Sequence, residues 1–160
     1  MSFIKKQSIG IWMEAATLLL GIISFIVYSV NIAGAGYFHG ARVDMAVRCG
    51  VIGLILSAVS IVLAEIPLEG IASKLVIMLS DCVRIAVPAL FIAATLYIVS
   101  ARVEGFAFIY FSNEEVLQEV QTAANLSSAH GAIANIIILG ATALIGIIGA
   151  FFTTKKKNVL

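Results

Sequence analysis

Four ionisable side chains lie within segments that are otherwise apolar, and their chemistry is the most informative feature of this chain. They are Glu14, Glu65, Asp81 and Arg84. An ionisable side chain costs about 2.5–3.5 kcal/mol at the centre of a bilayer on insertion scales, so such residues usually face the interior of a helix bundle and pair. Asp81 and Arg84 are three residues apart, which lets them pair on one helix face. Glu14 and Glu65 are then surplus carboxylates.

Surplus carboxylates in a low-dielectric environment favour their neutral form, so they can exchange a proton near neutral pH. Pro88 adds a second feature, because it cannot donate to the carbonyl of Arg84 and leaves that oxygen available to a cation. We therefore interpret the four residues as a proton- or cation-coupling site, called the charged cluster below. Two other interpretations stay open: a structural clasp in which two acids satisfy Arg84, and a contact for a partner's transmembrane helix.

Motifs for other chemistry are missing from the sequence. It contains no H-E-x-x-H, no G-x-S-x-G, no P-loop and no dinucleotide-binding fingerprint. The two histidines, His39 and His130, belong to separate loops, and the two cysteines, Cys49 and Cys82, fall at different depths. We therefore predict no catalytic residue, no cofactor and no metal site. The net charge of +1 gives no basic surface for nucleic acid, so we expect no nucleic-acid partner.

The composition identifies the kind of element that must position the charged cluster. Of the 160 residues, 61% are apolar and 12% are charged, whereas soluble domains are about 45–50% apolar and about 25% charged. So little charge cannot cover a water-exposed surface, which excludes a soluble globular domain. We expect an integral membrane protein, with one membrane domain over residues 1–160 and the lipid bilayer as its surroundings.

Four segments are long and apolar enough to cross a bilayer as helices, since a crossing needs about 20 residues. Their approximate ranges are 8–30, 48–68, 75–99 and 132–153. The connection between the second and third is short, so these two must be antiparallel neighbours. The sequence predicts an all-α fold, a four-transmembrane-helix antiparallel bundle.

Small and polar residues recur along each segment at alternating steps of three and four. This spacing places them on one helix face and describes a left-handed seam. Membrane helices associate through close backbone approach rather than hydrophobicity, so we expect these faces to point inward. The residues expected at the helix contacts are Gly21, Gly53, Ser57, Gly146 and Gly149.

The placement of lysine and arginine predicts the orientation. An even number of spans puts both termini on one side, and that side holds Lys5, Lys6, Lys74, Lys155, Lys156 and Lys157. The other side holds Arg42, Arg48 and Arg102. Because positive charge is enriched on the cytoplasmic side, we expect both termini in the cytoplasm and a location in the plasma (inner) membrane.

The segment between the third and fourth spans, residues 100–131, is the only long one outside the predicted membrane. Ser112 and Glu115 match a capping box, which predicts an amphipathic helix over about 112–126. Its polar face would carry Glu114, Glu115 and Glu119. We expect this extracytoplasmic helix either to cover the outer end of the bundle or to bind a partner.

Two classes of function compete, and neither is enzymatic. The first is an oligomeric transport protein or transporter subunit that uses the charged cluster for proton or cation coupling. The alternative is a non-transporting accessory or scaffold protein that binds a partner through its outer helix and its small-residue helix faces. Four helices enclose little space, so a transport path would need a second copy or another membrane protein. We favour transport because buried charge is costly, and a coupling role would explain the surplus carboxylates of Glu14 and Glu65.

Overall fold

The computed structural model describes residues 8–66 and 70–154, with side chains for 8–66 and 74–154. Within these ranges all regular structure is helical and no strand is present. The elements are α2 (Ile9–Ala33), α3 (Asp44–Glu65), α4 (Gly70–Phe111), α5 (Glu114–Val120) and α6 (Ala123–Ala150). Four of them, all except α5, are long and apolar enough to cross a membrane. This confirms the predicted all-helical class and indicates an integral membrane protein.

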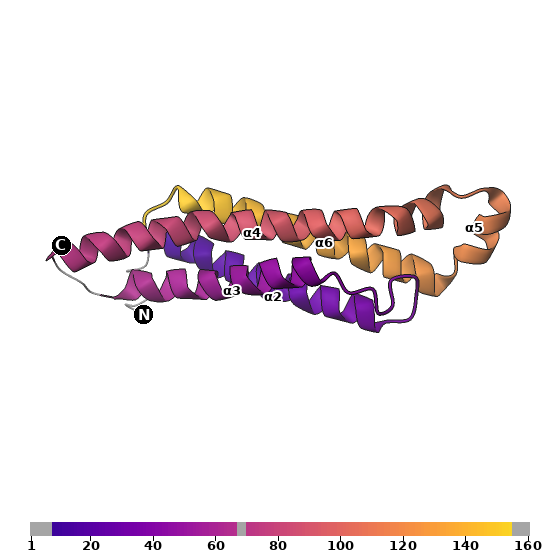
Figure 1. Ribbon diagram of the computed structural model, residues 1–160, viewed down its shortest axis with the longest axis horizontal. Helices are drawn as coiled ribbons and strands as arrows, with labels where there is room; N and C mark the ends of the chain where they lie inside the picture. The colour runs from indigo at the N-terminus through magenta and orange to yellow at the C-terminus, as the bar shows by residue number, and fades with distance from the viewer. Residues whose placement is uncertain (1–7, 67–69, 155–160) are drawn as a thin grey trace.

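The four long helices lie side by side along the long axis of the molecule (Figure 1). At one end, which we call the terminal end, Gly10 near the start of α2 contacts the backbone of Phe152, just past the end of α6. At the opposite or far end, the Asn31 side-chain amide donates to the carbonyl of Ser128, 2.7 Å away. The helix pairs in contact include α2 with α6, α3 with α4, and α4 with α6. Helix α5 lies at the far end, between the ends of α4 and α6 (Figure 1).

Interior positions follow the spacing of three and four along every long helix. In α4 they continue through Ile98, Arg102, Gly105 and Ile109, well beyond the apolar segment. In α2 they are Gly10, Glu14, Thr17, Gly21, Ser24 and Tyr28. Such a regular repeat keeps one face of each helix toward its neighbours. The same repeat therefore positions both the charged side chains and the glycines that allow close approach.

Phe91 of α4 fills the middle of the bundle. Its ring is completely buried, and it lies between Gly21 of α2 and Gly53 of α3, where an added Cβ would come within 3.0 Å and 3.3 Å of the ring. Apolar side chains surround Phe91 and continue toward the far end, including Ala94, Ile98 and Leu139. Gly21 of α2 and Gly53 of α3 thus leave the space that the Phe91 ring of α4 occupies.

The interior of the terminal half contains many polar groups. Its buried side chains include Glu14, Thr17, Ser57, Ser60, Ser80 and Arg84, beside apolar ones such as Val87. In hydrocarbon surroundings, buried polar groups are costly unless they find partners within the protein. The polar terminal half is therefore the part of the bundle that requires a chemical explanation.

Helices α4 and α6 are longer than the predicted spans at 75–99 and 132–153. Helix α4 runs on to Phe111 and α6 already begins at Ala123, so most of the predicted 100–131 segment belongs to these two helices. Hydropathy falls at this end of α4 because of Arg102, which is buried, and Glu104, which is exposed, whereas Val103, Phe108 and Phe111 keep its outer face largely apolar. The helices continue because they still bury residues, not because they are still uniformly apolar.

Helix α5 is shorter than the predicted helix over 112–126, and its predicted cap is wrong. The Asn113 side chain, not Ser112, caps the helix by accepting from the Val116 amide at 3.0 Å, whereas the Ser112 hydroxyl donates to the carbonyl of Phe108. Ser112 directly follows the last residue of α4, so its hydroxyl bonds back to a carbonyl in the final turn of that helix. Gln121 ends α5, and its side-chain amide donates to the carbonyl of Ile109.

The connection between α2 and α3 contains two glycines with positive φ, Gly36 at 140° and Gly40 at 67°. An added Cβ on Gly36 would meet the carbonyl oxygen of Ala124 at 2.5 Å, but one on Gly40 would meet nothing within 4 Å.

We expect Gly40→Ala to lower the free energy of unfolding by about 1 kcal/mol, the backbone cost alone. Gly36→Ala should cost about 2 kcal/mol, since overpacking adds to that cost. Thermal unfolding in detergent compares the two, and equal losses would contradict the packing argument.

Candidate functional site

Arg84 and Glu14 form a buried ion pair between α4 and α2. The guanidinium Nε of Arg84 lies 3.1 Å from Oε1 of Glu14, and the two side chains are 4% and 3% exposed. Each occupies an inward position of its helix, which is why residues 70 apart in the chain meet. A buried charge of either sign is tolerable only when it is paired in this way.

The same guanidinium also binds the end of α6. One of its terminal nitrogens donates to the carbonyl of Gly149 and, at 2.6 Å, to the carbonyl of Phe152. The last carbonyls of a helix have no partner within the helix, and a cation there interacts favourably with the helix dipole. Close approach depends on Gly149, where an added Cβ would lie 2.9 Å from the Met13 side chain. Arg84 therefore joins three helices at the terminal end.

The other two members of the charged cluster lie differently. Asp81 is 61% exposed, and its carboxylate oxygen is 3.8 Å from Nη1 of Arg84, so it reaches the pair from outside. Glu65 is half-buried at the end of α3, and the ion-pair partners of Arg84 within the described chain are Glu14 and Asp81. The structure thus brings together three of the four predicted residues and leaves Glu65 outside the ion pairs of Arg84.

Arg102 is a second buried arginine, which the sequence analysis assigned only to a loop. It lies 18 residues after Arg84, or five helical turns, so both face the interior about 27 Å apart. Its guanidinium donates to the carbonyl of Ala41 and lies 4.5 Å from the centre of the Phe38 ring. The interior spacing that continues past Ile98 is the signal that could have identified it. The two arginines bracket a length close to that of a hydrocarbon core, about 30 Å.

Several buried polar atoms have no hydrogen-bond partner in the described part of the chain. They are Oε2 of Glu14, the hydroxyls of Ser57, Ser60 and Ser80, and Oδ1 of Asn135. All except Asn135 belong to the polar terminal half. Among the described residues, no group of three or more His, Cys, Asp or Glu side chains is placed to hold a metal ion. Any ligand here would have to bind a mixed set of carboxylate and hydroxyl oxygens.

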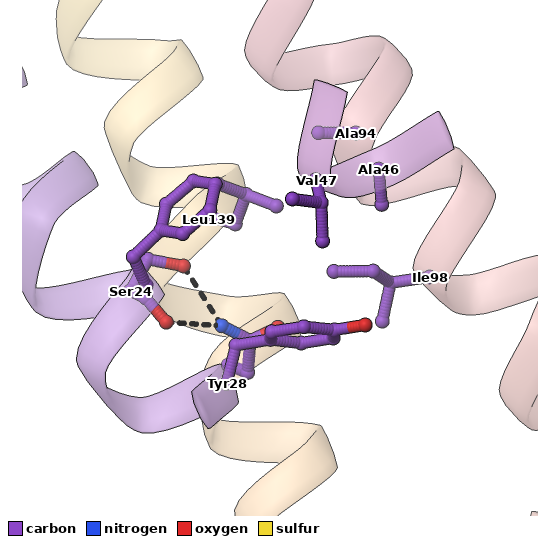
Figure 2. A pocket seen from close by; sticks show the side chains of 9 residues that line it. Ser24, Tyr28, Ala46, Val47, Ala94, Ile98 and Leu139 are labelled. Carbon is purple, nitrogen blue, oxygen red and sulfur yellow. Dashed lines mark hydrogen bonds between the residues drawn. The ribbon is translucent and has the colours of Figure 1, made fainter. Parts of the chain in front are cut away.

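Asn135 lines a different and smaller feature, a void whose other lining residues include Ser24, Tyr28 and Leu139 (Figure 2). The Asn135 side-chain amide donates to the carbonyl and the hydroxyl of Ser24, at 2.7 Å and 2.8 Å. The void has a volume of about 10 Å³ and lies between α2, α3, α4 and α6. That is about the space of one water molecule. The void is too small to be a solute site, and the Asn135–Ser24 contact holds α6 to α2.

The remaining predicted residues lie at helix contacts or on the surface. Gly146 and Gly149 face Thr17 and Met13 of α2, and Ser57 is completely buried. Glu114, Glu115 and Glu119 are exposed on α5, which has no buried residue, and none of the three forms an ion pair with another described residue. The acids of α5 are therefore open to a partner.

Comparison with known proteins adds no further constraint: no protein-family model, curated protein or solved structure matches this chain.

Proposed function

We propose that this chain is a non-transporting accessory protein of the plasma (inner) membrane, and that it binds a partner through the far end of its bundle. In this proposal the four long helices form an antiparallel bundle with both termini in the cytoplasm. The six lysines near the two ends of the sequence and between the second and third predicted spans support that orientation. The far end, with α5, then lies outside the cytoplasm.

The observation that carries the proposal is the charge of the far-end extension. Residues 103–131 contain four glutamates and no lysine or arginine, and the exposed α5 carries three of those glutamates. Like charges held together raise the local negative potential and attract a positively charged surface. An anionic bilayer would be repelled, so the complementary partner is a protein segment rich in lysine or arginine.

The interior of the bundle also supports a role without transport. Phe91 fills the axis between Gly21 and Gly53, so a single copy offers no open path at mid-length. The Arg84 guanidinium is engaged by a carboxylate and two carbonyls. Such contacts are what a clasp needs to hold helices together, and they leave little of the arginine's charge for an incoming solute.

Purification from native membranes in a mild detergent tests the proposal. We expect a particle whose mass corresponds to this chain and a second, different chain in fixed proportion. Changing Glu114, Glu115 and Glu119 together to lysine should reduce the recovered partner at least about tenfold, because charge reversal replaces attraction by repulsion at a protein interface. The three corresponding changes to glutamine should give a smaller loss.

The matched control is Asp44→Lys, a single reversal at an exposed acid near the same end. Asp44 pairs with Arg42 at 2.8 Å rather than facing a partner, so this variant should retain the second chain. Recovery of a lone monomer from the wild type, or full retention of the partner by the triple lysine variant, would overturn the proposal.

A second candidate function is proton- or cation-coupled transport by an oligomer, with the charged cluster as the coupling site. One observation favours it: Oε2 of Glu14 is buried without a hydrogen-bond partner, as expected of an oxygen that accepts a proton or cation. The same purification separates the candidates, since a defined homo-oligomer without a second chain favours transport.

A further inference from the structure

We propose that the polar terminal half of the bundle interior binds one monovalent cation, with Na⁺ as the best fit, between the carboxylate of Glu14 and the hydroxyls of Ser57 and Ser60. This site is separate from the far-end surface, and its existence does not depend on the proposed accessory function.

Three buried oxygens in this region lack hydrogen-bond partners. Oε2 of Glu14 and the hydroxyls of Ser57 and Ser60 have no hydrogen bond in the described chain. Glu14 is 3% exposed, and both serines are completely buried. Leaving a buried polar group unsatisfied costs about 1–3 kcal/mol, and more when the group is charged. Three such oxygens in one region indicate that a bound species supplies the partner that each of them lacks.

The register of α2 and α3 places these oxygens at the same depth. Near mid-length, Leu54 contacts the Gly21 position and Phe25 contacts the Gly50 position, so moving along α3 corresponds to moving backward along α2. Continuing that register puts Ser57 level with Thr17, and Ser60 level with Glu14. Both serines lie on the inward face of α3. One carboxylate and two hydroxyls on inward helix faces therefore lie within about one helical turn of one another in depth.

Helix α4 offers a fourth oxygen at this depth. Pro88 is buried at the Gly146 contact, and since proline has no N–H, the carbonyl of Arg84 lacks its usual helical donor. Carbonyls freed by helix interruptions are ligands for Na⁺ in membrane proteins. A carboxylate, a carbonyl and hydroxyls form a set of oxygens that suits a small hard cation rather than a transition metal.

Charge selects the valence of the ion. Glu14 and Asp81 carry two negative charges against the one positive charge of Arg84, so the three groups have a net charge of −1, with Asp81 exposed at the edge of the buried pair. A monovalent cation neutralises these three groups, whereas a divalent one would leave an excess of positive charge beside Arg84. Because charge in hydrocarbon surroundings is costly, the neutral arrangement is favoured.

Thermal unfolding of the purified full chain tests the site, with NaCl, KCl or choline chloride at equal ionic strength. A ligand that binds the folded state raises the Tm in proportion to the logarithm of its concentration above Kd. We expect the Tm to rise with NaCl relative to choline chloride, and its dependence on Na⁺ concentration gives the Kd. Ser57→Ala and Ser60→Ala should each raise that Kd about tenfold.

The matched control is Ser24→Ala, which removes a buried hydroxyl that already has a partner, Asn135. It should lower the Tm in all three salts but leave the Kd for Na⁺ unchanged. Equal Tm values in NaCl and choline chloride would overturn the proposal and assign the oxygens to water or a proton. A rise with KCl as large as that with NaCl would overturn the assignment of Na⁺.

Discussion

Arg84→Leu should lower the free energy of unfolding by about 3–5 kcal/mol, the usual cost of removing one partner from a buried ion pair. The variant leaves the Glu14 carboxylate buried without its cation, and it also strips the donor from the carbonyls of Gly149 and Phe152. Both losses occur at the junction of α2, α4 and α6. Thermal or denaturant unfolding in detergent measures the effect.

A double variant separates the pair from the rest of the junction. Glu14→Leu combined with Arg84→Leu removes both charges, so it should recover a large part of the stability lost by Arg84→Leu alone, as for other buried pairs replaced by apolar residues. Arg48→Leu is the matched single change, because Arg48 is exposed, and it should have little effect. If Arg84→Leu were no more harmful than Arg48→Leu, the buried clasp would not exist in solution.

The four long helices could be predicted from the sequence because crossing a bilayer imposes length and apolarity on each segment. The far ends of α4 and α6 could not, because hydropathy falls there at charged and polar residues such as Arg102, which the helix nevertheless buries. What persists there is the interior spacing, through Arg102 and Gly105 to Ile109. Spacing is thus a better guide than hydropathy to where these helices end.

The charged cluster was predicted as a group, and the structure brings Glu14 and Asp81 to Arg84. Asp81 and Arg84 meet because they are three residues apart. The closer partner of Arg84, Glu14, lies on another helix, and its contact depends on the relative register of α2 and α4. The carbonyls of α6 carry no sequence signal, since any residue supplies one. The sequence therefore indicated both acids that pair with Arg84 but not the carbonyls of Gly149 and Phe152 that bind it.

Phe91→Ala should lower the free energy of unfolding by about 2–3 kcal/mol. Lipid chains are as apolar as a phenyl ring, so the ring gains little from burial itself; what the variant loses is packing. Gly21 and Gly53 have no side chains to fill the vacated space. A cavity of the order of 100 Å³, at about 24 cal/mol per Å³, gives this magnitude. Thermal unfolding in detergent measures it.

Ile92→Ala is the control that distinguishes packing from general loss of apolar volume. Ile92 follows Phe91 on the same helix but is exposed on the outside of the bundle, where lipid or detergent can occupy the space left by its side chain. We expect a change below about 0.5 kcal/mol there, as at other non-core positions. Similar losses from the two variants would mean that Phe91 is not enclosed by three helices. A large difference would show that the glycines of α2 and α3 act by admitting this one ring, which is how small residues stabilise a bundle that hydrophobicity cannot hold together.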